Sequence, residues 1–296
     1  MNLESLTTER RNEATFGLDE MSVSTALAKM NNEDKKVAEA VEKALPMIEP
    51  VIEKTIESFN KGGRLIYLGA GTSGRLGVLD AAECVPTFGV EASMVVGLIA
   101  GGEEAMTVAV EGAEDDFELG KQDLIDLQLT TNDMVIGIAA SGRTPYVIGA
   151  LDYARELGAH TGSLACNFNA EISKHAEFPI EVDCGAEFLT GSTRLKSGTA
   201  QKLILNMIST ISMIGIGKVY NNLMVDVRPT NEKLVERSKR IIMQATECDY
   251  QVAEKTFYQA DEDVKLAIVM ILTNSEKQEA QEKLVEAKGF IKKTLS

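Results

Sequence analysis

An apolar run that leads straight into a glycine turn decides the fold of this chain: Leu65-Ile66-Tyr67-Leu68 is followed by Gly69-Ala70-Gly71-Thr72-Ser73-Gly74-Arg75. The stretch 76–83 that comes next suits a helix. A buried strand, a glycine turn and a helix start commonly bind anions, because glycines let backbone N–H groups approach a ligand and the helix N-terminus carries partial positive charge. With its hydroxyl groups on Thr72 and Ser73, the turn predicts a phosphate site; a plain turn between strand and helix is the alternative.

Two nucleotide motifs fit the turn less well. It lacks the lysine that ends a P-loop, which disfavours a nucleoside triphosphate. Gly69, Gly71 and Gly74 do spell the dinucleotide fingerprint G-x-G-x-x-G. That motif also needs an acidic residue at the end of the second strand to hold a ribose. Here the second strand ends in Ile99-Ala100-Gly101, so the ribose contact is missing.

A second copy of the same plan lies further along the chain. The run 134–138 is continuously apolar, as a buried parallel strand is, and leads into Ala139-Ala140-Ser141-Gly142-Arg143-Thr144-Pro145. Two such turns in one parallel sheet can face a single ligand at the carboxyl ends of the strands. Further strands are expected at 91–99, 162–166 and 178–182. We therefore predict an α/β fold with a doubly wound parallel sheet flanked by helices.

Composition excludes several classes of function. The chain has 296 residues, of which 44% are apolar, and a net charge of −15. Such a charge argues against nucleic acid and against an anionic membrane as partners, because both need a basic face. Four cysteines without Cys-x-x-Cys spacing argue against a zinc site or a disulfide framework. Without a signal peptide or a transmembrane run at its start, the chain is expected in the cytoplasm.

Three segments are expected from the change of pattern along the chain. Residues 1–20 are polar and predict an N-terminal arm, and 21–235 holds the α/β domain. Within that domain, 37–59 has helical periodicity but contains Pro46 and Pro50, which predicts a kink or two shorter helices. Residues 236–296 predict a small all-helical C-terminal module.

Candidate acid–base residues are two glutamates. Glu83 follows the glycine turn on a mainly apolar helix. A carboxylate at such a position forms an ion pair, faces a cleft or lies in water at the end of the helix. Glu114 lies in the acidic turn 111–116, and solvation is its simplest explanation. A dense polar cluster at 187–196 is either a solvated loop that caps the next helix or an anion site. It contains Glu187, Ser192, Thr193, Arg194 and Lys196.

These residues carry a family resemblance. The turns at 69–73 and 141–144 resemble the phosphosugar loops of sugar isomerase (SIS) domain proteins. The stretch Gly185-Ala186-Glu187-Phe188-Leu189-Thr190-Gly191-Ser192-Thr193-Arg194-Leu195-Lys196 resembles a signature that glucokinase regulatory protein shares with the N-acetylmuramic acid 6-phosphate etherases. The arm at 6–12 and the tail at 264–270 are also similar to the etherases, so the resemblance covers nearly the whole chain. Ala186, where the family commonly has proline, is a mild departure.

The resemblance implies a carbon–oxygen lyase that converts a phosphorylated amino sugar, N-acetylmuramic acid 6-phosphate, to N-acetylglucosamine 6-phosphate and D-lactate. It implies elimination followed by hydration, no metal or other cofactor, a homodimer, and a role in amino sugar catabolism and cell-wall recycling. The catalytic glutamates of the family fall on Glu83 and Glu114. A phosphosugar aldose–ketose isomerase and a non-catalytic phosphosugar regulator are the alternatives.

Two glutamates suit the implied elimination and hydration, because carboxylates can remove the C2 proton, protonate the leaving oxygen at C3 and then assist the addition of water. We expect the phosphate to be held by residues of the two turns, and the polar cluster to supply further substrate contacts. The phosphate set is Thr72, Ser73, Gly74, Ser141, Gly142 and Thr144. The further contacts are Glu187, Ser192 and Lys196.

Overall fold

The computed structural model describes residues 6–227, 229 and 231–295. The chain divides into two compact units. The first consists of Met1–Ala82 and Ser93–Ser209, and the second of Glu83–Ala92 and Thr210–Ser296. The domain boundaries expected near residues 20 and 235 stay predictions.

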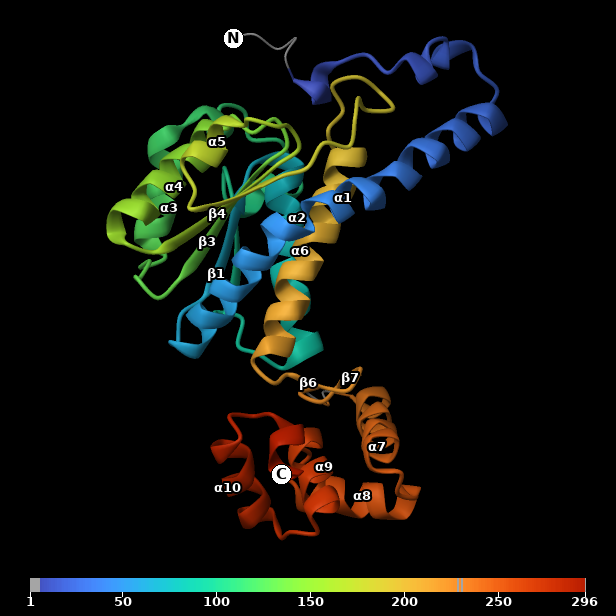
Figure 1. Cartoon of the computed structure of the whole chain (residues 1–296), viewed down its shortest axis with the longest axis vertical. Coiled ribbons are helices and arrows are strands. Elements are labelled where there is room, and N and C mark those ends of the chain that lie inside the picture. The colour runs from blue at the N-terminus through green and yellow to red at the C-terminus, as the bar shows by residue number, and fades with distance from the viewer. Residues whose placement is uncertain (1–5, 228, 230, 296) are drawn as a thin grey trace. The chain divides into compact units, whose positions relative to one another are not determined.

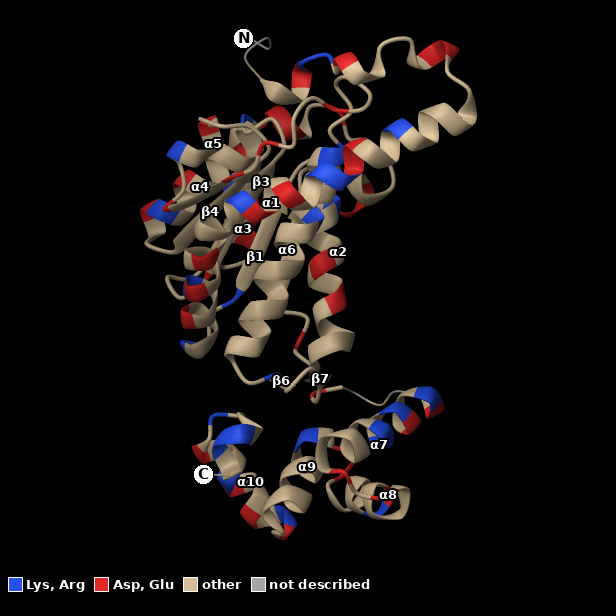
Figure 2. Cartoon of the chain, turned by 45° about the vertical axis from the view of Figure 1, so that its right-hand side comes forward, with Lys and Arg blue, Asp and Glu red and all other residues tan. Residues whose placement is uncertain are grey.

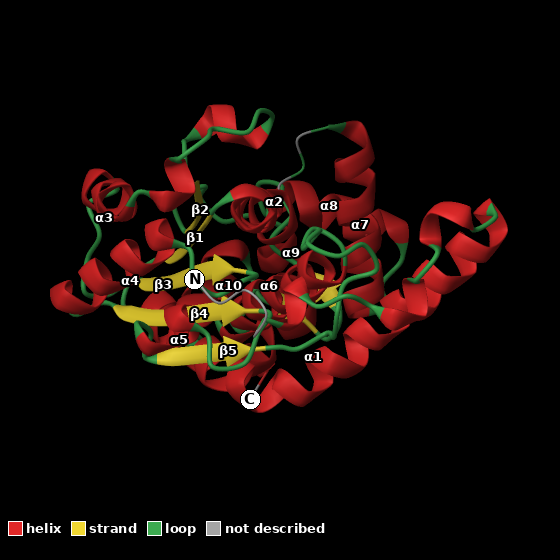
Figure 3. Cartoon of the chain, turned by 90° about the horizontal axis from the view of Figure 1, so that it is seen from above, coloured by secondary structure: helices red, strands yellow, loops and turns green. Residues whose placement is uncertain are grey.

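A five-stranded parallel sheet with strand order β2-β1-β3-β4-β5 forms the centre of the first unit (Figure 3). The strands are β1 (Leu65–Gly69), β2 (Val95–Ile99), β3 (Met134–Ala139), β4 (His160–Ala165) and β5 (Phe178–Glu181). Helix α1 contacts β1, β3 and β5 from one face, and α4 contacts β1, β3 and β4 from the other (Figure 1). The predicted α/β fold with a parallel sheet between helices is therefore confirmed.

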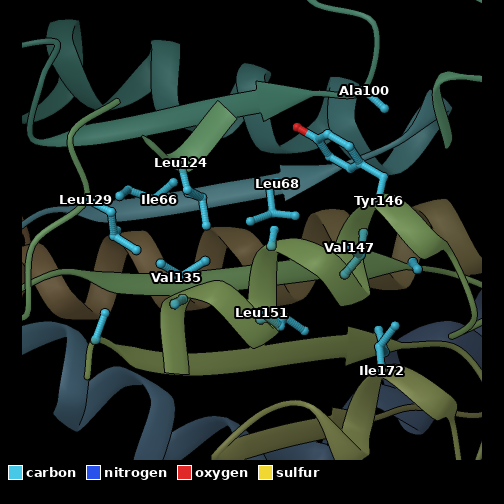
Figure 4. Packing of buried hydrophobic residues seen from close by; sticks show 14 of the residues in the cluster. Ile66, Leu68, Ala100, Leu124, Leu129, Val135, Tyr146, Val147, Leu151 and Ile172 are labelled. Atoms are coloured by element: carbon cyan, nitrogen blue, oxygen red, sulfur yellow. The ribbon is translucent and has the colours of Figure 1, made fainter. Parts of the chain in front are cut away.

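Burial explains why these runs become strands. The side chains of Leu65, Ile66, Tyr67 and Leu68 are at most 1% exposed, because the neighbouring strands and both helix layers cover them. Figure 4 shows Ile66 and Leu68 of β1 and Val135 of β3 packed with Val147 and Leu151 of α4. Parallel strands that are covered on both faces require this continuous apolar sequence.

The helices of the first unit extend the predicted pattern and correct it in one place. They are α1 (Val23–Asn60), α2 (Gly71–Phe88, which continues into the second unit), α3 (Phe117–Asp126), α4 (Pro145–Leu157), α5 (Glu171–Lys174) and α6 (Lys196–Gly215). The prediction of two shorter helices was wrong, because α1 is one helix of 38 residues that contains both Pro46 and Pro50. The alternative, a kink, stays a prediction. Pro46 is exposed and Pro50 half-buried, so water can hydrogen bond to the carbonyls that lose an N–H partner. The buried stripe from Val37 to Ile52 holds the helix together.

The N-terminal arm docks against the carboxyl edge of the sheet instead of standing free. Leu6 and Thr8 are buried, and the side-chain oxygen Oδ1 of Asn167 accepts hydrogen bonds from the Thr7 N–H at 2.7 Å and the Thr8 N–H at 3.4 Å. Nδ2 of Asn167 donates to the carbonyl of Ala140 at 3.0 Å. Asn167 therefore ties the arm to the residue that precedes Ser141.

Replacing Asn167 with alanine should release the arm. The change removes the acceptor of two backbone N–H groups, at a cost of about 1–3 kcal/mol. Because Arg10 and Arg11 lie in the arm, limited trypsin digestion should cleave there roughly tenfold faster than in the wild type. Asn60→Ala, at the exposed end of α1, is the control and should leave cleavage unchanged. Equal cleavage rates in the two variants would contradict the tether.

Besides the ends of α2 and α6, the described residues of the second unit form a small hairpin and four longer helices. These are β6 (Val219–Tyr220), β7 (Leu223–Met224), α7 (Glu232–Thr246), α8 (Tyr250–Gln259), α9 (Val264–Thr273) and α10 (Lys277–Glu286). Helix α9 is apolar and lies in the core of the unit, where Ala267, Ile268 and Val269 are fully buried. The sequence at 225–230, with Pro229, predicts an extended stretch, and residues 228 and 230 of this stretch lie outside the described residues.

Charge is spread over the helices of the chain. Figure 2 shows Asp and Glu interspersed with Lys and Arg along α1 and α7, in keeping with the net charge of −15. Across residues 6–295, apart from the two positions left undescribed, no helix has the length and apolar character needed to cross a membrane.

Candidate functional site

The glycine turn after β1 is shorter than the sequence suggests. Helix α2 begins at Gly71, so Thr72 and Ser73 lie in its first turn and not in a loop before it. The Gly74 N–H donates to the carbonyl of Ala70 at 3.3 Å, which makes Gly74 the first residue with a helical hydrogen bond. The N–H groups before it have no partner within the helix, as at any helix start. The start of α2 is therefore built to receive an anion.

Two glycines of the predicted set have a clear steric reason. A Cβ on Gly74 would lie 2.5 Å from the carbonyl oxygen of Gly69 and 2.7 Å from a side-chain carbon of Ile99. Gly142 has a φ of +73°, and a Cβ there would lie 2.4 Å from that of Ala170. Both turns therefore need glycine to pack closely against the sheet.

The second turn follows the neighbouring strand. Ser141, Gly142 and Thr144 come directly after β3, and Pro145 begins α4. In the register of β1 and β3, Gly69 pairs with Ile138, so both strands end at the same level. With strand order 2-1-3-4-5, the crevice between the ends of β1 and β3 is the position where such sheets bind ligands. The structure brings the two predicted phosphate turns together there.

Ser73 is held by a side chain that the sequence did not single out. Its hydroxyl donates to Oε1 of Gln201 on α6 at 3.0 Å, and both residues are buried. The amide nitrogen Nε2 of Gln201 is buried and, among the described residues, has no hydrogen-bond partner. A buried donor without a partner is costly and calls for an unseen acceptor. A polar residue on the apolar helix 196–215 is the signal that sequence reasoning could have used.

A cavity of about 170 Å³ lies beside the start of α2. Gly71 and Arg75 of α2, Ala100 after β2, and Glu111 and Glu114 of the acidic turn line it. Glu114 lies in the short helix η6 (Ala113–Asp115) and is exposed. The structure thus places one of the two predicted catalytic glutamates next to the helix start that carries Thr72 and Ser73.

Glu83 is located in the second unit, on the last turns of α2. Its side chain is exposed in the single chain, and Cys84 beside it is buried. Its catalytic role stays a prediction.

Two members of the polar cluster at 187–196, Glu187 and Lys196, are buried and organise the start of α6. Oε1 and Oε2 of Glu187, which is fully buried, accept hydrogen bonds from the backbone N–H groups of Ser197 and Lys196, each at 2.9 Å. The ammonium of Lys196, 1% exposed, lies 2.8 Å from Oε2 of Glu33 on α1. Ser192 remains accessible. These contacts give Glu187 and Lys196 structural roles, and their contact with substrate stays a prediction.

Glu33 is a charged residue that the sequence analysis missed. Burial alone would raise its pKa, but hydrogen bonds from Lys196, Lys36 and Asn12 outweigh burial and hold the pKa at about 2. Asn12 also donates to the carbonyl of Ala186, so this carboxylate joins α1, the arm and the cluster. An acidic residue at a buried position of an amphipathic helix was its only sequence signal.

Comparisons with known proteins show the family of the chain. Residues 47–155 match the family model described as glucokinase regulatory protein N-terminal SIS domain. The chain is 75% identical to "N-acetylmuramic acid 6-phosphate etherase 2" of Enterococcus faecalis and 78% identical to "N-acetylmuramic acid 6-phosphate etherase" of Lactococcus lactis subsp. lactis, over 100% of both chains in each case. Among solved structures it is similar to phosphoheptose isomerase GmhA of Neisseria gonorrhoeae, with a TM-score of 0.49 and 17% identity, covering 64% of this chain and 98% of that one.

The comparison with the curated relatives extends from the arm through the sheet to the last helices. Identity at this level extends over the full length of both chains. The chain therefore belongs to the family of N-acetylmuramic acid 6-phosphate etherases.

Proposed function

We propose that this chain is a carbon–oxygen lyase that cleaves the D-lactyl ether of N-acetylmuramic acid 6-phosphate and yields N-acetylglucosamine 6-phosphate and D-lactate. Full-length similarity to curated etherases is the observation that carries this function. The paired turns at the ends of β1 and β3 supply the phosphate site that such a substrate needs.

The phosphate is bound between the two turns. N–H groups at the start of α2, with the hydroxyls of Thr72, Ser73, Ser141 and Thr144, supply donors for its oxygens. Ser73 now donates to Gln201, so it must turn its proton toward the phosphate when substrate binds. A rotated Gln201 amide would then donate to Ser73, and its buried Nε2 would gain the partner that it lacks among the described residues.

The reaction proceeds by elimination and hydration. In the open-chain sugar the C2 proton is acidic because it lies next to the C1 aldehyde. Glu114 takes this proton, a C2–C3 double bond forms, and the C3–oxygen bond breaks while Glu83 protonates the departing lactate oxygen. Water then adds its hydroxyl to C3 and a proton returns to C2, so that the carboxylates exchange duties. No net oxidation occurs.

Assembly and location complete the proposal. The exposed position of Glu83 in the single chain is compatible with an active site that a second copy closes, so we propose a homodimer. We also propose a cytoplasmic enzyme of cell-wall sugar recycling.

The products of turnover test the function. Incubation with N-acetylmuramic acid 6-phosphate in water enriched in ¹⁸O should give N-acetylglucosamine 6-phosphate that carries the label at C3, with unlabelled lactate. Mass spectrometry reads both products. Conversion of fructose 6-phosphate to an aldose without lactate release would favour the isomerase, and tight binding without turnover would favour the regulator.

Replacing Ser141 with alanine should mainly weaken substrate binding. A hydroxyl that donates to a phosphate oxygen forms a charge-assisted hydrogen bond, so KM for the phosphorylated sugar should rise about tenfold with a smaller change in kcat. Steady-state assays of lactate release measure both constants. Unphosphorylated N-acetylmuramic acid is the matched control substrate, and an equal loss with both sugars would contradict the assignment of the phosphate to this turn.

A further inference from the structure

The guanidinium of Arg75 connects two parts of the site. Arg75 lies in the second turn of α2, and its Nε donates to the carbonyl of Met106 at 3.0 Å. Its Nη2 donates to the carbonyl of Ala105 at 2.8 Å. The planar guanidinium therefore binds two successive carbonyls at once, a geometry that lysine cannot reproduce.

The segment that Arg75 holds leads to Glu114. It leaves β2 through Gly101 and Gly102, forms the short helix η5 (Glu103–Met106), and reaches Glu114 eight residues later. At the far end Ala113 packs against the core, and Oδ1 of Asp116 caps α3 by accepting from two backbone N–H groups at 3.0 and 3.1 Å. The segment that carries Glu114 is therefore held to α2 at one end and to α3 at the other.

We propose that Arg75 is a positioning residue that sets the distance between the phosphate site and Glu114. Its backbone belongs to the helix whose first turn carries Thr72 and Ser73, and its side chain fixes the segment that carries the acid–base carboxylate. Arg75, Ala105 and Glu114 line the same cavity, so a shift of the segment changes the space in which the sugar reacts. The inference rests on the proposed function, because it gives Glu114 a catalytic duty.

Arg75→Lys is the first test, because it keeps the charge and removes the planar fork. A displacement of about 1 Å at a reacting group can cost roughly 100-fold in rate, so kcat should fall about 10- to 100-fold. KM for the phosphorylated sugar should stay within about threefold, since the turn itself is untouched. Arg75→Gln, which keeps one planar amide donor, is the second variant should the lysine variant fail to fold.

Arg64→Lys is the matched control. Arg64 is also half-buried, and its guanidinium also donates to two successive carbonyls, those of Leu127 and Gln128, each at 3.0 Å. It precedes β1 and therefore lies at the opposite, amino edge of the sheet. Its lysine variant should lose some thermal stability and keep the wild-type kcat.

A double-mutant cycle with Glu114→Gln separates positioning from direct contact. If Arg75 acts through Glu114, adding Arg75→Lys to Glu114→Gln should lower kcat by less than about twofold further. The proposal would be overturned if the kcat losses of the two single variants multiplied in the double variant. It would also be overturned if Arg75→Lys lost affinity for N-acetylmuramic acid 6-phosphate but not for N-acetylglucosamine 6-phosphate, which lacks the lactyl carboxylate. Wild-type kcat in Glu114→Gln alone would overturn the catalytic duty of Glu114 in the proposed function, so the two failures are distinct.

Discussion

Glu83→Gln should abolish measurable lactate release, with kcat lowered roughly 1,000- to 10,000-fold. A positioned general acid contributes about 100- to 10,000-fold, and the upper part of that range is expected because an alkoxide is a poor leaving group. Glutamine keeps the size and polarity of the side chain and removes only its ability to transfer a proton. The assay is lactate release from N-acetylmuramic acid 6-phosphate under saturating substrate.

Proton exchange tells which step the variant has lost. If Glu83 protonates the leaving oxygen, Glu83→Gln should still exchange the C2 proton for deuterium in D₂O, whereas Glu114→Gln should not. Loss of exchange in the Glu83 variant would reverse the two roles. Glu118→Gln, an exposed glutamate on α3, is the control for a generic change of surface charge and should keep full activity. Wild-type turnover in Glu83→Gln would remove this residue from the mechanism.

Lys196→Met should be the most destabilising change in the polar cluster. It leaves the carboxylate of Glu33, 5% exposed, without its buried cation. Breaking a buried ion pair from one side costs about 3–5 kcal/mol, and denaturant unfolding should show a loss of this size. Lys36→Met is the matched control: Lys36 also contacts Glu33, but its side chain is 58% exposed, so its loss should cost less than about 1 kcal/mol.

The two partners should show strong coupling. Adding Glu33→Gln to Lys196→Met removes the orphaned charge and should restore part of the lost stability. A Lys196→Met protein with wild-type stability and a raised KM would instead favour a contact between Lys196 and the substrate.

The same pair predicts a pH dependence. The pKa of Glu33 falls from an ordinary value of 4.5 to about 2 in the folded chain. A lowered folded-state pKa means that the contribution of Glu33 to stability is complete above about pH 4.5 and disappears as the pH falls through about 2. In the Lys196→Met variant the folded-state pKa rises toward 4.5, so the decline in unfolding free energy below about pH 4.5 should be smaller and end at a higher pH.

Local patterns in the sequence were enough for the sheet and for the family. The runs 65–68 and 134–138 are apolar without interruption, and both became central strands because both faces of the sheet are covered. The etherase signature and the two turns identified the family, and the full-length relatives confirm that assignment and the lyase activity. These signals are local and need no knowledge of distant contacts.

Contacts between distant parts of the chain were not predictable in this way. The sequence alone predicts that Pro46 and Pro50 interrupt the helix. Water can replace the lost hydrogen bonds only on the outer face, and the sequence does not show that the two prolines lie there. The contact between Ser73 and Gln201 joins residues 128 positions apart, and the contact between Glu33 and Lys196 joins residues 163 positions apart. Spacing along the sequence says nothing about such pairs, so the support of the candidate site had to come from the structure.

The docked arm has a consequence for biosynthesis. Thr7 and Asn12 leave the ribosome well before their partners Asn167, Asp183 and Ala186, which lie 160, 176 and 174 positions later. At roughly 5–20 residues per second, about 10 to 40 seconds pass before the last of these partners is made. The arm therefore cannot dock until these later segments have been made. The bridge from the arm through Asn167 to the residue before Ser141 can therefore form only after β4 and Asn167 have been made.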